Sequence, residues 1–193
     1  MKLPIEFYTR DDVVNIARDL LGKVLCTRID GIETKARLIE TEAYAGISDK
    51  ASHAYGDRRT KRTEPMYADG GIAYVYLCYG IHHLFNVVTS IAGTPHAVLV
   101  RAGKPLHGTK TMLQRRAKQK EDKTLLGGPG SLAKALGITT LDTGCSLIEN
   151  RIWIEDSDFR ATEDSIVAGP RIGIDYAQED AIRPYRFVLS TSQ

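Results

Sequence analysis

The chain has 193 residues, enough for one domain or at most two small ones. Its hydrophobic fraction of 42% and charged fraction of 26% are those of an ordinary globular protein, and no apolar run is long enough to span a membrane. The first residues do not resemble a signal peptide, and three widely spaced cysteines exclude a disulfide framework and a CxxC zinc site. We therefore expect a cytoplasmic protein with no membrane partner.

The net charge of +2 conceals an uneven distribution. Residues 50–62 contain five Lys or Arg and one Asp, and residues 101–123 contain eight Lys or Arg, one Glu and one Asp. Two basic segments in an otherwise acidic chain indicate a surface for a polyanion such as nucleic acid. Two solvated charged loops would produce the same pattern.

The first 44 residues predict a helix followed by a hairpin. Thr9 and Asp12 have capping-box spacing, apolar residues follow at helical spacing, and Gly22 marks the end of the helix. The alternating runs 23–29 and 36–44 flank a turn-rich link and predict two antiparallel strands.

The rest of the chain predicts mostly short strands. They lie at 72–79, 84–90, 97–102, 151–155, 171–174 and 185–190. Helices are predicted at 108–120, with a basic outer face, and after the Gly-Pro-Gly loop of 127–138, where Gly137 ends the helix. Because helices and strands do not alternate regularly, we expect one α+β domain over residues 1–193 with a largely antiparallel sheet.

The segment "LIETEAYAG" places two carboxylates beside an aromatic ring. Residues two apart in a strand share a face, so Glu40, Glu42 and Tyr44 lie together, with the two carboxylates about 7 Å apart. In a partly buried site, repulsion and desolvation would raise one pKa and leave a usable base. The alternative is a polar outer face with ion pairs to a neighbouring strand.

Three tyrosines follow in "GIAYVYLCYG". Tyr74 and Tyr76 share a face, either as core residues that need hydroxyl partners or as rings that stack on a planar base. Tyr79 precedes the turn at Gly80 and should point outward, where a ring can wedge into a base stack. His53 is structural unless its loop folds over the carboxylates.

Other polar groups also have two interpretations. Asn86, in an apolar run, could satisfy backbone groups or contact a ligand. Arg101, at the end of a strand, could pair with Glu40 or Glu42, or hold a phosphate. The loop "GGPGS" offers backbone N–H groups for a phosphate, although the Walker lysine is absent.

Together these motifs resemble the alkyladenine (3-methyladenine) DNA glycosylase family, in order, from about residue 9 to 188. The motifs are "ARLIETEAYAG", "ASHAYGDRRTKR", "GIAYVYLCYG", "AVLVRAGKPLHG", "LLGGPGSLAKALGI" and "RIGIDYAQEDAIRPYRF". The compact length is similar to that of bacterial members.

The resemblance implies an α+β domain with a curved sheet and a protruding hairpin. Such enzymes bind duplex DNA in the minor groove, flip out a damaged purine and hydrolyse its N-glycosidic bond. The implied substrates are 3-methyladenine, 7-methylguanine, hypoxanthine and ethenoadenine, with no metal, cofactor or lyase lysine. A monomer associated with the bacterial nucleoid is also implied.

The resemblance also implies roles for individual residues. Glu42 is the base that activates water and Arg101 is a second ligand of that water. Tyr44, His53 and Tyr76 hold the flipped base, Asn86 screens bases, and Tyr79 fills the vacated space. The implied contacts to the DNA backbone are Arg58, Arg59, Gly128 and Gly130.

The chain departs from some relatives at Ile81 and His82, just after the hairpin turn, and in the length of "SIAGTPH" before Arg101. Two other functions also fit parts of the pattern. A non-catalytic nucleic-acid binding module explains the basic segments and tyrosines but not the carboxylates. A metal-dependent nuclease would use Glu40 and Glu42, but the further acidic or histidine ligands it needs are missing from the sequence.

Overall fold

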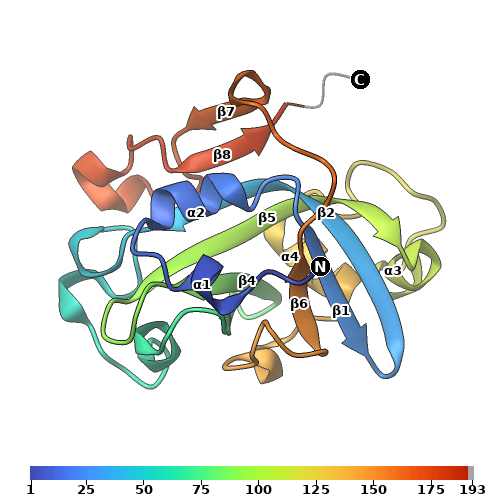
Figure 1. The fold of residues 1–193 in the computed structure, drawn as a ribbon, viewed down its shortest axis with the longest axis horizontal. Helices are drawn as coiled ribbons and strands as arrows, with labels where there is room; N and C mark the ends of the chain where they lie inside the picture. Colours follow the sequence, from blue (N-terminus) through green and yellow to red (C-terminus); the bar gives the residue numbers. More distant parts are fainter. Residues whose placement is uncertain (191–193) are drawn as a thin grey trace.

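A curled antiparallel sheet runs through residues 1–190, which are the residues that the computed structural model describes (Figure 1). Six strands lie side by side in the order β3-β4-β5-β2-β1-β6, while β8 pairs with β2 and with β7. Their bounds are β1 (Val24–Ile29), β2 (Ile32–Tyr44), β3 (Ala73–Cys78), β4 (His82–Thr89), β5 (His96–His107), β6 (Ile152–Glu155), β7 (Ile166–Gly169) and β8 (Arg186–Leu189). Every pairing is antiparallel, which confirms the predicted α+β class.

The longest strand, β2, is central to the sheet. It pairs with β5 along most of its length, with β1 in its first half and with β8 at Glu40, Thr41 and Glu42. Register shifts on both sides of Glu40 bend the strand, as β-bulges do. Glu42 therefore lies beyond a bend, between β5 and β8, where its side chain is enclosed by other elements.

The helices cover parts of the sheet, with α2 in front of it and α4 behind it in Figure 1. Four are α-helical: α1 (Ile5–Tyr8), α2 (Val13–Asp19), α3 (Thr109–Arg116) and α4 (Pro129–Leu136). Short 3₁₀ turns lie at Gly46–Ser48, Tyr55–Asp57, Glu64–Tyr67, Thr140–Asp142, Glu163–Ser165 and Asp175–Asp180. α4 buries Leu132, Ala133 and Leu136 against the sheet, and Gly137 ends it in the left-handed conformation, as predicted. None of the helices in residues 1–190 has the length and apolarity to cross a membrane.

Three helix boundaries differ from the prediction, and one of them is the end of α2, which lies at Asp19 rather than next to Gly22. The cap of α2 is Asp12, whose side chain accepts the N–H of Asn15, while Thr9 ends the preceding helix. α3 stops at Arg116 because Ala117 is left-handed, with φ of 51°. Spacing alone did not separate these alternatives.

The predicted strand at 171–174 is wrong, because these residues form a loop. Gly173 is left-handed, with φ of 76°, and Arg171 is buried in an ion pair instead of alternating with its neighbours. The strand in this region is β7, whose half-exposed residues give little periodic signal.

The hairpin between β3 and β4 ends in an exposed turn. Tyr79 and Gly80 both have positive φ, 51° and 73°, and Ile81 N–H closes the turn onto Cys78. Two positive φ values are the signature of a tight hairpin turn, which normally prefers Asn-Gly. The Tyr79 side chain is 91% exposed, so its predicted outward direction is confirmed.

Candidate active site

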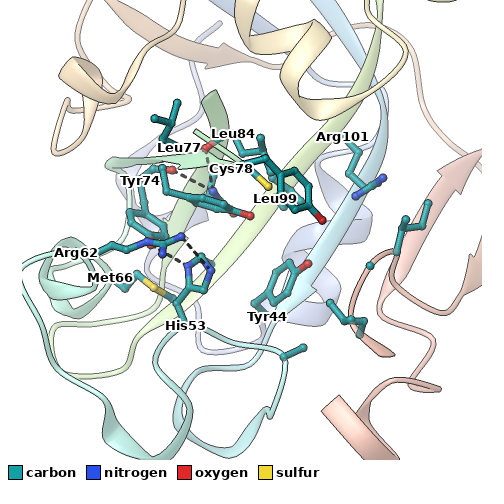
Figure 2. A pocket seen from close by; sticks show the side chains of 18 of the residues that line it. Tyr44, His53, Arg62, Met66, Tyr74, Leu77, Cys78, Leu84, Leu99 and Arg101 are labelled. Carbon is teal, nitrogen blue, oxygen red and sulfur yellow. Dashed lines mark hydrogen bonds between the residues drawn. The ribbon is translucent and has the colours of Figure 1, made fainter. Parts of the chain in front are cut away.

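A cavity of about 460 Å³ lies between the end of β2, the β3–β4 hairpin and the loop after residue 171 (Figure 2). Its walls are largely aromatic and apolar with a few polar groups, as in many ligand sites. In Figure 2, Tyr44 and Arg101 lie on one side and Tyr74 and Arg62 on the other. Six of the predicted site residues line it: Tyr44, His53, Tyr76, Tyr79, Asn86 and Arg101.

Glu42 lies directly behind this wall and is fully buried. Its Oε2 accepts the Tyr44 hydroxyl at 2.9 Å and Nη1 of Arg101 at 3.3 Å. Its Oε1 accepts the backbone N–H of Ile172 at 2.8 Å. A carboxylate has about four acceptor positions, so these three contacts leave room for one more donor, such as a water.

Glu40 shares the face of Glu42, as the alternation predicts. Nε of Arg101 donates to Glu40 Oε1 at 2.9 Å, so one guanidinium bridges both carboxylates. Arg186 on β8 also donates to Glu40, at 2.6 Å. Glu40 therefore forms the cross-strand ion pairs of the alternative interpretation, while Glu42 is held against the cavity wall.

The pKa of Glu42 is raised above the ordinary value. Burial is the largest cause, and the charge of Glu40 adds to it. Arg101, the Ile172 N–H and the Tyr44 hydroxyl act in the opposite direction. Glu42 is thus a stronger proton acceptor than an exposed glutamate, with a cation beside it that favours its charged form.

His53 folds over the cavity and contacts both tyrosines of β3. Its Nδ1 lies 2.9 Å from the Tyr74 hydroxyl, and its ring meets that of Tyr76 edge-on at 4.7 Å. Arg62 can only donate, so its 3.4 Å contact assigns the His53 proton to Nδ1. Burial, and then the charges of Arg62 and Arg58, lower the pKa of His53 to about 4, so the ring is neutral at pH 7.

Tyr74 and Asn86 have structural partners as well as places in the cavity wall. Tyr74 is buried and its hydroxyl is paired with His53, which fits the core interpretation. The Asn86 amide donates to the carbonyls of Tyr74 and Leu84, so it satisfies backbone groups. Tyr76 remains partly accessible and faces the cavity.

The conformation of Tyr79 leads to a stability prediction. A left-handed bulky residue costs roughly 1–2 kcal/mol, whereas Asn tolerates this region. Because the exposed ring makes little contact with the fold, Tyr79→Asn should raise the free energy of unfolding by about 1 kcal/mol. Urea denaturation measures this change. A lower free energy of unfolding in the variant would mean that the ring stabilises the hairpin through contacts.

The predicted contacts to the DNA backbone lie away from the cavity wall. Arg58 and Arg59 are exposed, and Arg59 pairs with Glu64 at 2.8 Å. Gly128 and Gly130 begin α4, where a Cβ on Gly130 would stand 3.0 Å from the His82 ring. The start of α4 is thus beside the hairpin rather than inside the cavity. Within residues 1–190, no three His, Cys, Asp or Glu side chains converge to hold a metal ion.

The sequence interpretation missed two arginines of the site, Arg62 in the cavity wall and Arg171 behind it. Arg62 stacks over the Tyr76 ring at 5.0 Å while it contacts His53. Arg171 lies over the Tyr44 ring at 4.8 Å and forms a buried ion pair with Asp49. These arginines are separated from their partners in the sequence and follow no periodic pattern, so only the fold brings them together.

Comparisons with known proteins identify the family of the chain. The family model for methylpurine-DNA glycosylase matches residues 6–193. A Chlamydia abortus protein, provisionally named a 3-methyladenine DNA glycosylase, is 50% identical over 188 residues that cover 97% of each chain. Relatives with the same name from Desulfitobacterium hafniense and Bacillus cytotoxicus are each 45% identical, over all of this chain and 97% or 98% of theirs. The chain therefore belongs to the methylpurine-DNA glycosylase family.

Proposed function

We propose that the protein is a monofunctional DNA glycosylase that hydrolyses the N-glycosidic bond of alkylated or deaminated purines in duplex DNA. The observation that carries the proposal is the Glu42 carboxylate, buried behind an aromatic cavity and hydrogen-bonded to Tyr44 and Arg101, which line it. The proposed substrates are 3-methyladenine, 7-methylguanine, hypoxanthine and ethenoadenine, and the product is an abasic site.

Access to a base in a duplex requires that the nucleotide leave the stack, which costs a few kcal/mol. The exposed ring of Tyr79 lies three residues from Tyr76, which lines the cavity. In the proposal, the hairpin enters the minor groove, Tyr79 fills the gap and the base moves into the cavity. Damaged and mispaired bases leave the stack most easily, which favours them over normal bases.

A cationic purine fits the aromatic walls of the cavity, which also include two cations, Arg62 and Arg101. Tyr44 and Tyr76 offer ring faces, and cation–π attraction adds about 1–2 kcal/mol in a desolvated site. His53 beside them is neutral at pH 7, since its pKa is about 4, so it does not repel a charged base. Below that pH, protonated His53 would weaken the binding of such a base.

In the proposed reaction, a water occupies the free acceptor position of Glu42 and attacks C1′ of the sugar. The water gives its proton to the carboxylate as the new C–O bond forms and the purine leaves with the electrons of the C–N bond. The sugar has oxocarbenium character in the transition state, which an ionised carboxylate nearby stabilises. Arg101 holds Glu42 in its charged form and contacts the same region.

The test uses 25-mer duplexes that each carry one lesion, with an undamaged duplex as the control. Excess protein is incubated with each duplex in EDTA, and abasic sites are detected as strand breaks after alkali. We expect strand breaks in at least one lesion duplex, none in the undamaged duplex, and no break without alkali. Binding without abasic sites would overturn the proposal and favour a non-catalytic binding module.

A further inference from the structure

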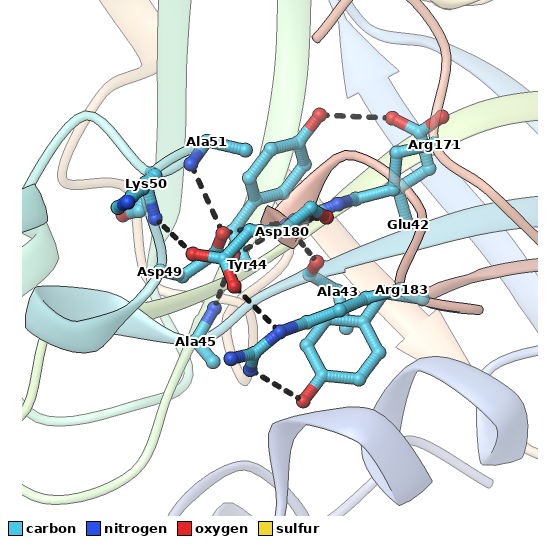
Figure 3. Close-up of polar contacts among 12 residues, drawn as sticks. Glu42, Ala43, Tyr44, Ala45, Asp49, Lys50, Ala51, Arg171, Asp180 and Arg183 are labelled. Atoms are coloured by element: carbon cyan, nitrogen blue, oxygen red, sulfur yellow. Dashed lines mark hydrogen bonds and ion pairs between the residues drawn. The ribbon is translucent and has the colours of Figure 1, made fainter. Parts of the chain in front are cut away.

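A buried ion pair supports the cavity wall from behind (Figure 3). The side chains of Arg171 and Asp49 are both fully buried, and the guanidinium donates to both carboxylate oxygens, from Nη2 at 2.8 Å and from Nη1. Asp49 also accepts the backbone N–H groups of Ala45 and Ala51, each at 3.0 Å. Burial raises the pKa of Asp49, but Arg171 and these N–H groups outweigh it and hold the carboxyl below its usual range.

Arg171 contacts the strand segment that carries Glu42 and Tyr44. Its guanidinium lies 4.8 Å from the centre of the Tyr44 ring, and its Nη1 donates to the carbonyl of Ala43 at 2.9 Å. Arg171 does not line the cavity, so it supports the ring from the side turned away from a bound base. One side chain thus fixes both the ring of Tyr44 and the backbone just before it.

Ile172, the residue after Arg171, connects this ion pair to Glu42. Ile172 donates its N–H to Glu42 Oε1 at 2.8 Å, and this bond lowers the pKa of Glu42. Within residues 1–190, this loop pairs with no strand that would hold the N–H in place. The anchor of this loop is Arg171, the residue just before Ile172, and its side chain is held by the ion pair with Asp49.

Stability alone does not account for this arrangement. A buried ion pair contributes little net stability compared with apolar residues of similar volume. Within residues 1–190, Nε of Arg171 is buried with no hydrogen-bond partner, which is a further energetic penalty.

We propose that Arg171, held by Asp49, is a positioning residue for the reaction. It fixes the Ile172 N–H on Glu42 and the Tyr44 ring against the flipped base. This inference rests on the proposed function, since it assumes that Glu42 is the base. It predicts that a change at Arg171 alters the pKa of Glu42.

The first test is Arg171→Lys. This variant keeps the positive charge beside Asp49 but loses the planar contact with the Tyr44 ring and the bidentate hydrogen bonding to Asp49. Release of the Ile172 N–H would raise the pKa of Glu42, so the acid limb of the rate–pH profile should move upward by about one unit. At a pH below both inflections, the single-turnover rate should fall about tenfold or more. The affinity for duplex that carries an uncleavable abasic-site analogue should stay the same.

The matched control is Arg183→Met. Arg183 belongs to the same cluster, where it pairs with Asp180 at 2.6 Å and stacks over Tyr185 at 5.6 Å. Within residues 1–190, its ion pair, hydrogen bond and ring contact go to Asp180 and Tyr185, and none goes to Ala43 or Tyr44. We expect this variant to lower the melting temperature and leave the acid limb in place. Equal shifts of the acid limb in both variants would overturn the proposal.

A double variant, Asp49→Asn with Arg171→Met, separates positioning from the effect of an unpaired buried charge. It leaves no unpaired buried charge, so we expect it to fold even if Arg171→Lys does not, and a thermal melt checks this. We expect its acid limb to be shifted as well, and a wild-type profile would overturn the proposal. Failure of the proposed function itself has a different signature, because the wild type would then release no abasic sites from any lesion duplex.

Discussion

Glu42→Gln should lower the single-turnover rate of base excision by about 10²–10⁴-fold and leave the affinity for lesion-containing duplex unchanged. The amide cannot take a proton from water, and it carries no charge to stabilise an oxocarbenium-like sugar. The amide oxygen can still accept the Ile172 N–H, and the amide NH₂ can donate to the Tyr44 hydroxyl oxygen, so the cavity should keep its shape. Rates are measured with excess protein on a 7-methylguanine duplex, and affinity by fluorescence anisotropy.

The matched control for this variant is Glu33→Gln. Glu33 lies on the same strand, β2, and is also paired with an arginine, Arg28 at 2.7 Å. It is on the half of the strand that pairs with β1, away from the cavity. A loss of rate in Glu33→Gln comparable to that in Glu42→Gln would show that the effect is a general disturbance of the strand.

Arg101→Gln should lower the rate at pH 7 by about 10²-fold. Arg101 is the largest influence that lowers the pKa of Glu42, so its removal leaves two neighbouring carboxylates without the cation between them. The pKa of Glu42 then rises further, so a smaller fraction of Glu42 is ionised at any given pH. The loss should therefore shrink as the pH is raised.

Glu40→Gln is a control in which the acid limb should move in the opposite direction to that expected for Arg101→Gln. The charge of Glu40 raises the pKa of Glu42, so its removal should move the acid limb to lower pH. In the double variant with Arg101→Gln, the two changes should partly cancel. If Arg101→Gln were equally slow at every pH, its role would be confined to holding water or substrate, and the electrostatic argument for Glu42 would fail.

The local sequence pattern was sufficient to predict the strand face that carries the two carboxylates. Residues two apart in a strand share a face, which predicts Glu40 and Glu42 on one side, and the bridging Arg101 confirms it. The turn at Gly80 likewise predicts an outward Tyr79, because no strand can continue through two left-handed residues. In both cases the physical cause lies within a few residues of the feature.

The support of the site could not be predicted in the same way. Asp49 and Arg171 are far apart in the sequence, and "RIGI" has the composition of a strand. Burial of the arginine against Asp49 overrides that propensity, so the segment forms a loop that delivers the Ile172 N–H to Glu42. A pattern based on periodicity carries no information on such a pairing.

The rate–pH profile of 7-methylguanine excision tests the central claim most directly. A cationic purine leaves without protonation, so the profile reports the ionisation of the base alone. Because the pKa of Glu42 is raised, we predict that the wild-type rate falls as the pH drops through an inflection above the ordinary range of a glutamate. We also predict that this inflection is missing from the residual activity of Glu42→Gln. A profile that is flat in the wild type, or an inflection that persists in the variant, would contradict the role of Glu42 as the base.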